Sequence, residues 1–422
     1  MRIVVNDYSG HPFQVQLSRE LARRGYEVLH VHCPSYETGK GALERRCGDP
    51  AGFHSIGVEL RDQVRKYSLW KRPLQEREYA TRLIRPVEEF APDLVLSANT
   101  PILAQALFQT ACRRRGYPFV FWQQDVYTLP MKTLLKQRVP LAGRVLGEAI
   151  TALEGALLRR SAAVVTISKD FLPILEKWRV PSDRLHVIEN WAPLDELPTH
   201  PKDNAWAREH GLTERRVLLY AGMLGIKHDP ELLVCLAERF RRHDDVRVVV
   251  ITGGYGSDYL RQAAVERRLE NLVLLDYQPY ERLSEVLASA DVLLVILEPD
   301  AGVFSVPSKV LTYMSAGRPL VAAIPRENLA ARVIALSGAG IITDARDSAA
   351  FADATERIIS DTELAARLGR NGRRYAEATF DIELVADRFE SVFDQAIQSH
   401  SMSRGKPLTA RSKTSTEAVA GD

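Results

Sequence analysis

A lysine and two serines surround the predicted start of a helix in the second half of the chain. The stretch FSVPSKVLTYMSAGRP, residues 304–319, follows the apolar run VLLVIL, and Ser305, Ser308 and Lys309 lie where the chain enters the helix. Backbone N–H groups at a helix start are unpaired and carry partial positive charge, so an added hydroxyl and ammonium predict an anion site. The same residues also fit a plain helix start, with Ser305 as the cap and Pro307 in the first turn. The stretch alone leaves both interpretations open.

Two other loops in the second half combine glycine with polar residues at the ends of apolar runs. Gly222 and Gly225 bracket a tight loop that leads to Lys227. Gly253 and Gly254 directly follow the run VRVVVIT. Glycine lets a flat or charged group approach the backbone, and a lysine beside exposed N–H groups is suited to bind phosphate. An ordinary turn between a strand and a helix explains the same glycines, so this alternative also stays open.

The first half places polar side chains after two of its apolar runs. Gly10 and His11 follow RIVVND, with no G-x-G-x-x-G that would indicate dinucleotide binding. Gln124 and Asp125 directly follow the apolar run FVFWQ. Asp125 can orient a hydroxyl or act as a base, or it can simply cap the next segment. His11 can contact a substrate, or it can be a neutral structural residue at a loop–helix junction.

Short apolar runs alternate with amphipathic segments through both halves, which is typical of βα units on parallel sheets. The strand candidates are RIVVN, EVLHVH, DLVLSA, FVFWQQ and AAVVTIS, and then VLLYAG, VRVVVITGG, LVLLDY, DVLLVIL, LVAAI and GAGIIT. We therefore expect an α/β protein with two doubly wound domains. In such sheets ligands bind beyond the carboxyl ends of the strands, where the loops described above would converge.

The stretch ENWAPLDELPTHPKDN, rich in proline and acidic residues and without periodicity, predicts a linker between the halves. The segment DIELVADRFESVFDQAI predicts a final amphipathic helix, and the polar, unpatterned residues after it predict a disordered tail. The expected division is residues 1–188, linker 189–204, residues 205–379, helix 380–398 and tail 399–422.

Composition restricts the class of protein. The chain has 422 residues, of which 45% are hydrophobic and 26% charged, as in soluble globular proteins. Four scattered cysteines, with no C-x-x-C, predict neither a zinc site nor a disulfide framework and favour a reducing compartment. Neither a signal peptide nor a membrane-spanning run is predicted. Nor is there a P-loop, a G-x-S-x-G elbow or a carboxylate cluster suited to magnesium. We expect a cytoplasmic protein without a metal or cofactor.

Basic residues are concentrated in residues 101–150, which hold seven Lys and Arg against two Asp and Glu. An ordinary solvated surface explains this excess as well as a functional surface does. The functional alternative is contact with an anionic membrane surface, at the inner face of the cell membrane, or with a pyrophosphate-bearing acceptor. Nucleic acid is not expected, because the basic residues are not interleaved with an aromatic platform.

The order of these segments resembles the retaining GT-B glycosyltransferases of family four. In particular it is similar to the bacterial branch that adds sugars to O-antigen, capsule or exopolysaccharide intermediates, including N-acetylfucosaminyltransferase-like enzymes. The resemblance runs from Met1 to about residue 398. It rests on SGHPFQVQLSRELARRGYEV, YAGMLGIKH, ITGGYGSDYL and, most specifically, FSVPSKVLTYMSAGRPLVA.

The resemblance implies two Rossmann-like domains that face each other across a cleft, with the last helix returning to the first domain. It places the donor nucleotide on the second domain and the acceptor on the first. Tyr277 and Gln278 would lie against the base, and the loop of Gly10 and His11 would close over the phosphates. The implied catalytic residues are Lys227, Lys309 and Asp125. The implied nucleotide-sugar site comprises Gly10, His11, Gly222, Gly225, Gly253, Gly254, Tyr277, Gln278, Phe304, Ser305, Val306, Pro307, Ser308 and Thr312.

The chain also departs from the family pattern. Many members carry two glutamates eight positions apart, one for the donor sugar and one for the ribose, where this chain has Phe304 and Thr312. An arginine is common where this chain has Met223, and a histidine where it has Gln124. These departures leave the sugar and ribose contacts without their usual carboxylates.

The implied reaction is metal-independent transfer of a sugar, with retention, from a nucleotide diphosphate sugar to a glycan. A UDP-sugar is favoured over a GDP-sugar, the sugar is of hexosyl or N-acetylhexosaminyl type, and the acceptor is a glycan or a lipid-linked polysaccharide intermediate. Two alternatives stay open: a nucleotide-sugar epimerase of the same fold, and an inactive partner subunit that binds nucleotide sugar without turnover.

Overall fold

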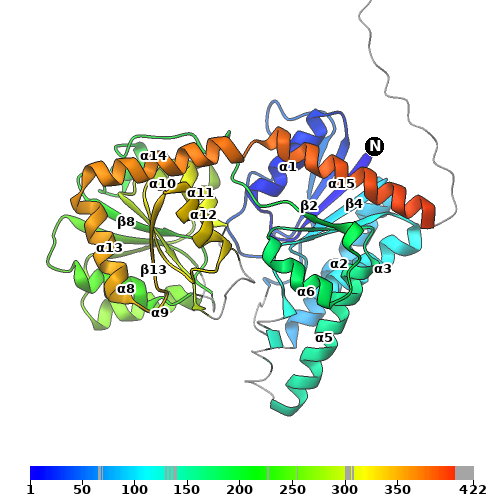
Figure 1. Cartoon of the computed structure of the whole chain (residues 1–422), viewed down its shortest axis with the longest axis horizontal. Helices are drawn as coiled ribbons and strands as arrows, with labels where there is room; N and C mark the ends of the chain where they lie inside the picture. Colours follow the sequence, from blue (N-terminus) through cyan, green and yellow to red (C-terminus); the bar gives the residue numbers. More distant parts are fainter. Residues whose placement is uncertain are drawn as a thin grey trace, which may run out of the picture.

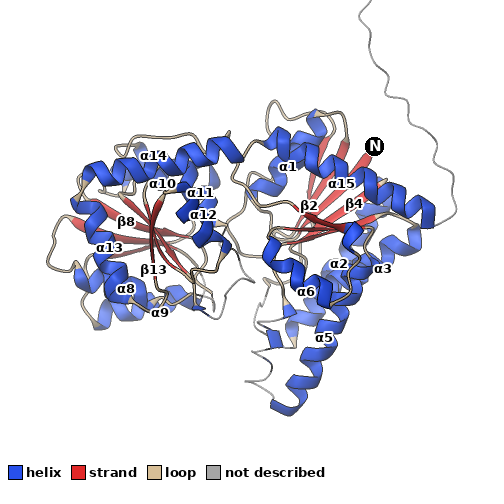
Figure 2. Ribbon diagram, viewed as in Figure 1, coloured by secondary structure: helices blue, strands red, loops and turns tan. Residues whose placement is uncertain are grey.

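The computed structural model describes residues 1–64, 68, 70–128, 131–132, 135, 140–225, 228–253, 255–299, 306 and 308–403. Two α/β domains lie side by side, each with a parallel sheet between layers of helices (Figures 1 and 2). The α/β class expected from the alternating apolar runs is therefore confirmed.

The sheet of the first domain has the strand order β3-β2-β1-β4-β5-β6-β7 among the described residues, and every pairing is parallel. The central strands are buried on both faces, which is why they read as continuous apolar runs. The strands are β1 (Arg2–Asp7), β2 (Glu27–His32), β3 (Phe53–Gly57), β4 (Leu94–Ala98), β5 (Phe119–Gln123), β6 (Ala163–Thr166) and β7 (Leu185–Val187). The helices are α1 (Pro12–Arg23), α2 (Lys71–Phe90), α3 (Ile102–Arg115), α5 (Pro140–Arg160) and α6 (Leu172–Lys177), with short 3₁₀ turns at Lys169–Phe171 and Ser182–Arg184.

The sheet of the second domain has the order β10-β9-β8-β11-β12-β13 and is also parallel throughout the described residues. Helices α10, α11 and α12 cover one face, and α8, α9 and α13 cover the other (Figure 1). The strands are β8 (Arg216–Ala221), β9 (Val246–Ile251), β10 (Leu272–Leu275), β11 (Val292–Ile296), β12 (Leu320–Ala323) and β13 (Gly340–Thr343). The helices are α7 (Ala205–Glu209), α8 (Glu231–Arg239), α9 (Tyr255–Glu266), α10 (Leu283–Ala288), α11 (Lys309–Ser315), α12 (Leu329–Ser337), α13 (Ser348–Ser360) and α14 (Thr362–Thr379), with a 3₁₀ turn at Tyr280–Arg282.

The last helix, α15 (Ile382–Ser403), leaves the second domain and packs on the first (Figure 1). Phe389 lies edge-on to Trp122, with ring centroids 4.8 Å apart. Arg24 of α1 donates to the carboxylates of Asp387 and Glu390 at 2.6 Å each. The expected return of this helix to the first domain is thus confirmed.

Two differences from the sequence-based expectations concern the edges of these elements. Strands β3 and β7 were not predicted, because FHSIG and LHV are short edge strands with polar residues rather than buried apolar runs. Helix α15 continues to Ser403, into the segment predicted as a tail, whose remaining residues lie outside the described part. None of the described helices is both long enough and apolar enough to cross a membrane.

Candidate functional site

A buried ammonium lies at the carboxyl ends of β8 and β11 in the second domain. Lys309 is the first residue of α11, and its Nζ atom lies 3.7 Å from the centroid of the Tyr220 ring on β8. Nζ is buried and has no hydrogen-bond partner within the described part of the chain. Burial lowers the pKa of Lys309 to about 7, because the charged form loses its hydration. A buried cation without a partner is costly, so this geometry favours binding of an anion.

The loop after β8 brings Gly222 close to this ammonium. Gly222 has a φ of +137°, and a Cβ on it would lie 3.2 Å from Lys309 Nζ. Apart from Lys309 and the two chain neighbours of Gly222, no described residue lies within 4 Å of that Cβ position. The Tyr313 hydroxyl fixes the preceding peptide, since it accepts from Ala221 N at 2.8 Å and donates to Ala221 O at 2.9 Å. Glycine at position 222 therefore lets the backbone lie close to the ammonium, where any side chain would press on Lys309.

The rest of this loop is closed by backbone and imidazole contacts. Gly225 N–H donates to His228 Nδ1 at 3.2 Å, and His228 N–H donates to Gly225 O at 3.0 Å. The Tyr220 hydroxyl donates to Met223 O at 2.9 Å. These contacts tie Met223 to β8 and Gly225 to His228. Lys227 lies outside the described residues.

The glycine loop after β9 contacts both the segment after β10 and the first domain. A Cβ on Gly253 would lie 2.9 Å from Tyr277 Cε2 and 3.1 Å from Oε1 of Glu37, which follows β2. Burial raises the pKa of Tyr277 to about 12, and the nearby Glu37 carboxylate contributes. Gln278 Oε1 accepts from Trp206 Nε1 at 2.9 Å. The two domains therefore face each other across Gly253 and Tyr277.

In the first domain the loop of Gly10 and His11 is organised by Asp7, which sequence reasoning did not identify. Asp7 ends β1 and is fully buried, and its carboxylate accepts from Ser9 N–H at 3.1 Å and from His11 N–H at 2.5 Å. Asn99, in the left-handed region at φ +53°, donates to it at 3.4 Å. Burial raises the pKa of Asp7 to about 7. Gly10, at φ +75°, makes the turn over this carboxylate. A carboxylate at the end of an apolar strand is the signal that would have indicated this site.

A second buried carboxyl lies near Asp125. Glu154 on α5 is fully buried and accepts from Thr128 N–H at 3.2 Å. Burial raises the pKa of Glu154 to about 7, and the charge of Asp125 contributes. Gln124 Oε1 accepts from Asn190 Nδ2 at 2.7 Å. Asp125 thus stands at the carboxyl end of β5 beside another acid, an arrangement suited to moving or holding a proton.

Several residues of the expected donor site lie outside the described part of the chain: Lys227, Gly254, Phe304, Ser305 and Pro307. Val306, Ser308 and Thr312 are half-buried. Ser308 precedes α11 without a side-chain hydrogen bond to the helix start. The structure thus brings together Lys309 with Gly222 and Gly253 with Tyr277.

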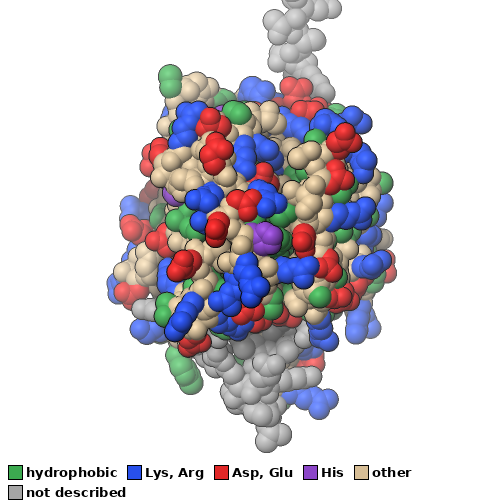
Figure 3. All heavy atoms as spheres, turned by 90° about the vertical axis from the view of Figure 1, so that its left-hand side faces the viewer, with side chains coloured by type: hydrophobic (Ala, Val, Ile, Leu, Met, Phe, Trp, Pro, Cys, Tyr) green, Lys and Arg blue, Asp and Glu red, His purple; other side chains and the backbone are tan. Residues whose placement is uncertain are grey.

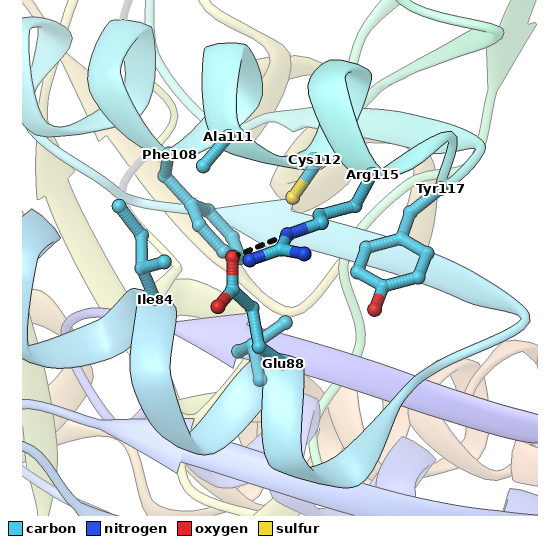
Figure 4. A pocket seen from close by; sticks show the side chains of 8 residues that line it. Ile84, Glu88, Phe108, Ala111, Cys112, Arg115 and Tyr117 are labelled. Atoms are coloured by element: carbon cyan, nitrogen blue, oxygen red, sulfur yellow. Dashed lines mark hydrogen bonds and ion pairs between the residues drawn. The ribbon is translucent and has the colours of Figure 1, made fainter.

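A small pocket elsewhere in the first domain does not belong to this site. It lies between α2 and α3 and is lined by Ile84, Phe108, Cys112 and Tyr117 (Figure 4). The ion pair between Arg115 and Glu88, at 2.7 Å, crosses it. Because Arg115 ends α3, the pocket lies at the far end of that helix from the carboxyl ends of the strands.

Metal and nucleic-acid chemistry receive no support from the described residues. They contain no cluster of three or more His, Cys, Asp or Glu side chains that could hold a metal ion. On the face of the second domain shown in Figure 3, acidic and basic side chains are interspersed. Nucleic-acid-binding surfaces are instead dominated by basic side chains.

Comparisons with known proteins agree with this geometry. The family described as glycosyl transferase 4-like domain matches residues 11–191, and the family of glycosyl transferases group 1 matches residues 202–375. YtcC of Bacillus subtilis, named as a glycosyltransferase, is 23% identical over 59% of this chain and 64% of its own length. WcaI of Escherichia coli, whose name assigns it to colanic acid biosynthesis as a glycosyl transferase, is 24% identical over 87% of this chain and 92% of its own length.

The fold also matches a solved structure over nearly its whole length. Anabaena Alr3699/HepE in complex with UDP-glucose superimposes with a TM-score of 0.69 and 16% identity, covering 93% of this chain and 99% of that one. This similarity establishes the GT-B fold. Since the two family matches together take in most of the chain, we conclude that it belongs to the group 1 glycosyltransferases of family four.

Proposed function

We propose that the chain transfers a sugar from a nucleotide diphosphate sugar, a UDP-sugar in preference to a GDP-sugar, to a glycan hydroxyl. The observation that carries this proposal is the buried Lys309 ammonium, which lies beside Gly222 and lacks a partner among the described residues. A fixed cation in a dry cleft is suited to stabilise the negative charge that grows on a departing phosphate. HepE, which shares the fold, binds UDP-glucose, and this supports a UDP-sugar as donor.

The reaction breaks the bond between the anomeric carbon and the phosphate oxygen and forms a bond to the acceptor oxygen. The acceptor proton passes to the departing phosphate, so the sugar keeps its anomeric configuration by attack on the same face. Lys309 and Lys227 stabilise the phosphate, and Asp125 orients the acceptor hydroxyl. The pyrophosphate is surrounded by Gly222, Gly225, Gly253, Gly254 and residues 304–308. The base lies against Tyr277 and Gln278, and Thr312 lies on the donor side. The loop of Gly10 and His11 closes the cleft.

The acceptor in this proposal is a lipid-linked polysaccharide intermediate of the O-antigen, capsule or exopolysaccharide type, used at the inner face of the cell membrane. The assignment of WcaI to colanic acid biosynthesis supports this class. Helix α5 supports membrane contact, because Val145 and Leu146 are 73% and 50% exposed beside the exposed Arg144. We expect salt-sensitive binding to anionic vesicles that falls when Val145 and Leu146 are both replaced by serine. Equal binding to neutral vesicles would contradict this contact.

The donor assignment is tested by the thermal stabilisation that UDP- and GDP-sugars produce in the wild type, in Lys309→Ala and in a matched control. Lys177→Ala removes an exposed lysine from the first domain and serves as that control. A ligand at about 100 times its Kd raises the free energy of unfolding by about 2.7 kcal/mol. We expect a UDP-sugar to stabilise the wild type and Lys177→Ala equally, and Lys309→Ala much less.

Turnover assays with and without a glycan acceptor separate the proposed transfer from its alternatives. Product formation only when the acceptor is present supports transfer. Conversion of the donor without an acceptor would indicate an epimerase, and binding without any turnover would indicate an inactive partner subunit. Absence of stabilisation by every nucleotide sugar would refute the donor site itself.

A further inference from the structure

The Lys309 ammonium contacts an aromatic ring rather than a carboxylate. Its Nζ atom lies over the face of the Tyr220 ring at 3.7 Å from the centroid, a distance typical of a cation–π contact. The ring is fully buried in the core of the second domain and belongs to β8, far from Lys309 in the sequence. Its hydroxyl donates to Met223 O in the loop that leads from β8, so the ring and the loop are linked.

A ring and a carboxylate would have different consequences for an anion site. A carboxylate would neutralise the ammonium and compete with any incoming phosphate. The ring quadrupole attracts the cation but carries no net charge, so the positive charge stays available. We propose that Tyr220 is a positioning residue for the donor phosphate: its ring places the Lys309 ammonium beside Gly222 without neutralising it. This inference rests on the proposed function, since it assigns a role within the same site.

The titration of Lys309 can be distinguished from that of the ionisable groups around it. Tyr313 on α11 and Tyr277 both interact with Tyr220. Burial raises the pKa of all three tyrosines above 10, so they stay neutral up to pH 9. The His228 ring lies edge-on to the Tyr220 ring, with centroids 6.5 Å apart. On α14, which packs against α11, Arg373 donates to Ser315 O at the opposite end of α11 from Lys309.

The arrangement predicts that donor binding takes up a proton at alkaline pH. Burial holds the pKa of Lys309 near 7 in the free protein, and a bound phosphate favours its charged form. Affinity should therefore be greatest below pH 7 and fall by up to about tenfold for each pH unit above it. UDP-glucose is a suitable probe, because its pyrophosphate does not titrate between pH 6 and 9.

A shape-conserving pair of substitutions isolates the role of the ring. Tyr220→Phe keeps the ring face and loses the hydroxyl bond to Met223 O, whereas pentafluorophenylalanine at position 220 keeps the shape and reverses the charge of the ring face. We expect Tyr220→Phe to keep the pH midpoint of UDP-glucose binding close to that of the wild type. The fluorinated ring should lower this midpoint by about one pH unit and weaken binding at pH 8 about tenfold, with little change at pH 6.

Two controls make the outcome decisive. Lys309→Met should bind UDP-glucose more weakly and lose the pH dependence, and any dependence that remains in it belongs to other groups, such as Asp7. Phe240→Leu loses an aromatic ring from the same core, and Phe240 is a buried residue that follows α8. This variant reports the effect of destabilisation alone and should keep the wild-type midpoint.

The titration of Lys309 in ligand-free protein, followed by NMR of ¹³C-labelled lysine, tests the positioning role independently of the donor. We expect a midpoint near 7 in the wild type and in Tyr220→Phe, and a lower one with the fluorinated ring. If UDP-glucose does not bind but these midpoints differ as stated, the donor assignment fails while the contact stands. Identical midpoints with Tyr220→Phe and the fluorinated ring would overturn the proposal.

Discussion

Asp7 in the first domain and Lys309 in the second are buried ionisable groups at corresponding places, the carboxyl ends of the central region of each sheet. Burial moves both pKa values to about 7, from opposite sides. Asp7 accepts hydrogen bonds from Ser9, His11 and Asn99, so its charge is satisfied within the chain. Lys309 has the Tyr220 ring but no hydrogen-bond partner among the described residues. The difference is consistent with our proposal, in which Asp7 organises a loop and Lys309 binds the donor phosphate.

The largest expected effect comes from Lys309→Met. If Lys309 serves the ligand rather than the fold, kcat/KM for sugar transfer should fall by about 10²–10³ while the ligand-free protein becomes more stable. The gain in stability should be greatest at pH 7 and below. The pKa of Lys309 is lower in the folded protein than in the unfolded chain, so the wild type gains stability as pH rises from about 7 toward 10.5.

Steady-state kinetics and thermal unfolding of Lys309→Met at pH 6.5 and 9 provide the measurement. Lys177→Ala is again the matched control. A loss of activity accompanied by a loss of stability at both pH values would mean that Lys309 is structural and would break the comparison with Asp7.

Asp7→Asn should show the opposite pattern at acid pH, with stability reduced and the intrinsic donor affinity of the second domain retained. An amide nitrogen facing the N–H groups of Ser9 and His11 leaves donors unpaired, at a cost of about 1–3 kcal/mol. The pKa of Asp7 is raised in the folded protein, so its contribution to stability is present at acid pH and is lost as pH rises from about 4 to 7. Urea unfolding should therefore show a cost that shrinks over this range. Donor affinity lost in proportion to activity would assign Asp7 to the donor site instead.

The apolar runs predicted the interior strands well, because a strand buried on both faces must be continuously apolar. Strands β3 and β7 escaped this signal because edge strands tolerate polar residues such as His54 and His186. The pairing of Lys309 with Tyr220 also could not be predicted, since it joins α11 to β8 across the domain. Local spacing indicated that Lys309 was a candidate, but only packing shows that its charge is buried and has no hydrogen-bond partner in the part of the chain that the structure describes. Asp7 could have been noted as a carboxylate at the end of an apolar strand, but its hydrogen bonds depend on the course of the following loop and could not be predicted.

The first domain also buries a neutral histidine, His30, which extends the comparison to acid pH. Its Nδ1 lies 2.9 Å from Ser18 Oγ, and burial lowers its pKa to about 3. The unfolded chain takes up a proton near pH 6.5, so stability falls as pH drops below that value. His30→Gln removes this loss. Between pH 7 and pH 5, the free energy of unfolding of the variant should therefore rise by about 2 kcal/mol relative to that of the wild type. Parallel pH dependence of urea unfolding in the two proteins would contradict this assignment.

Gly222→Ala should have the smallest effect of this series. The new Cβ lies 3.2 Å from Lys309 Nζ, and the φ of +137° strains any residue with a side chain. We expect UDP-glucose affinity to fall about tenfold, since about 1.4 kcal/mol of contact or strain is involved. Gly211→Ala, at φ +64° with open space around it, is the matched control for backbone strain. Equal donor affinity in both variants, measured by calorimetry, would show that Gly222 does not shape the phosphate site.

The most direct test of the central claim is a crystal structure of the protein with UDP-glucose bound. We expect a phosphate oxygen within about 3 Å of Lys309 Nζ, beside Gly222, with the Tyr220 ring still beneath the ammonium. A nucleotide bound elsewhere, with Lys309 buried and unchanged, would contradict the account.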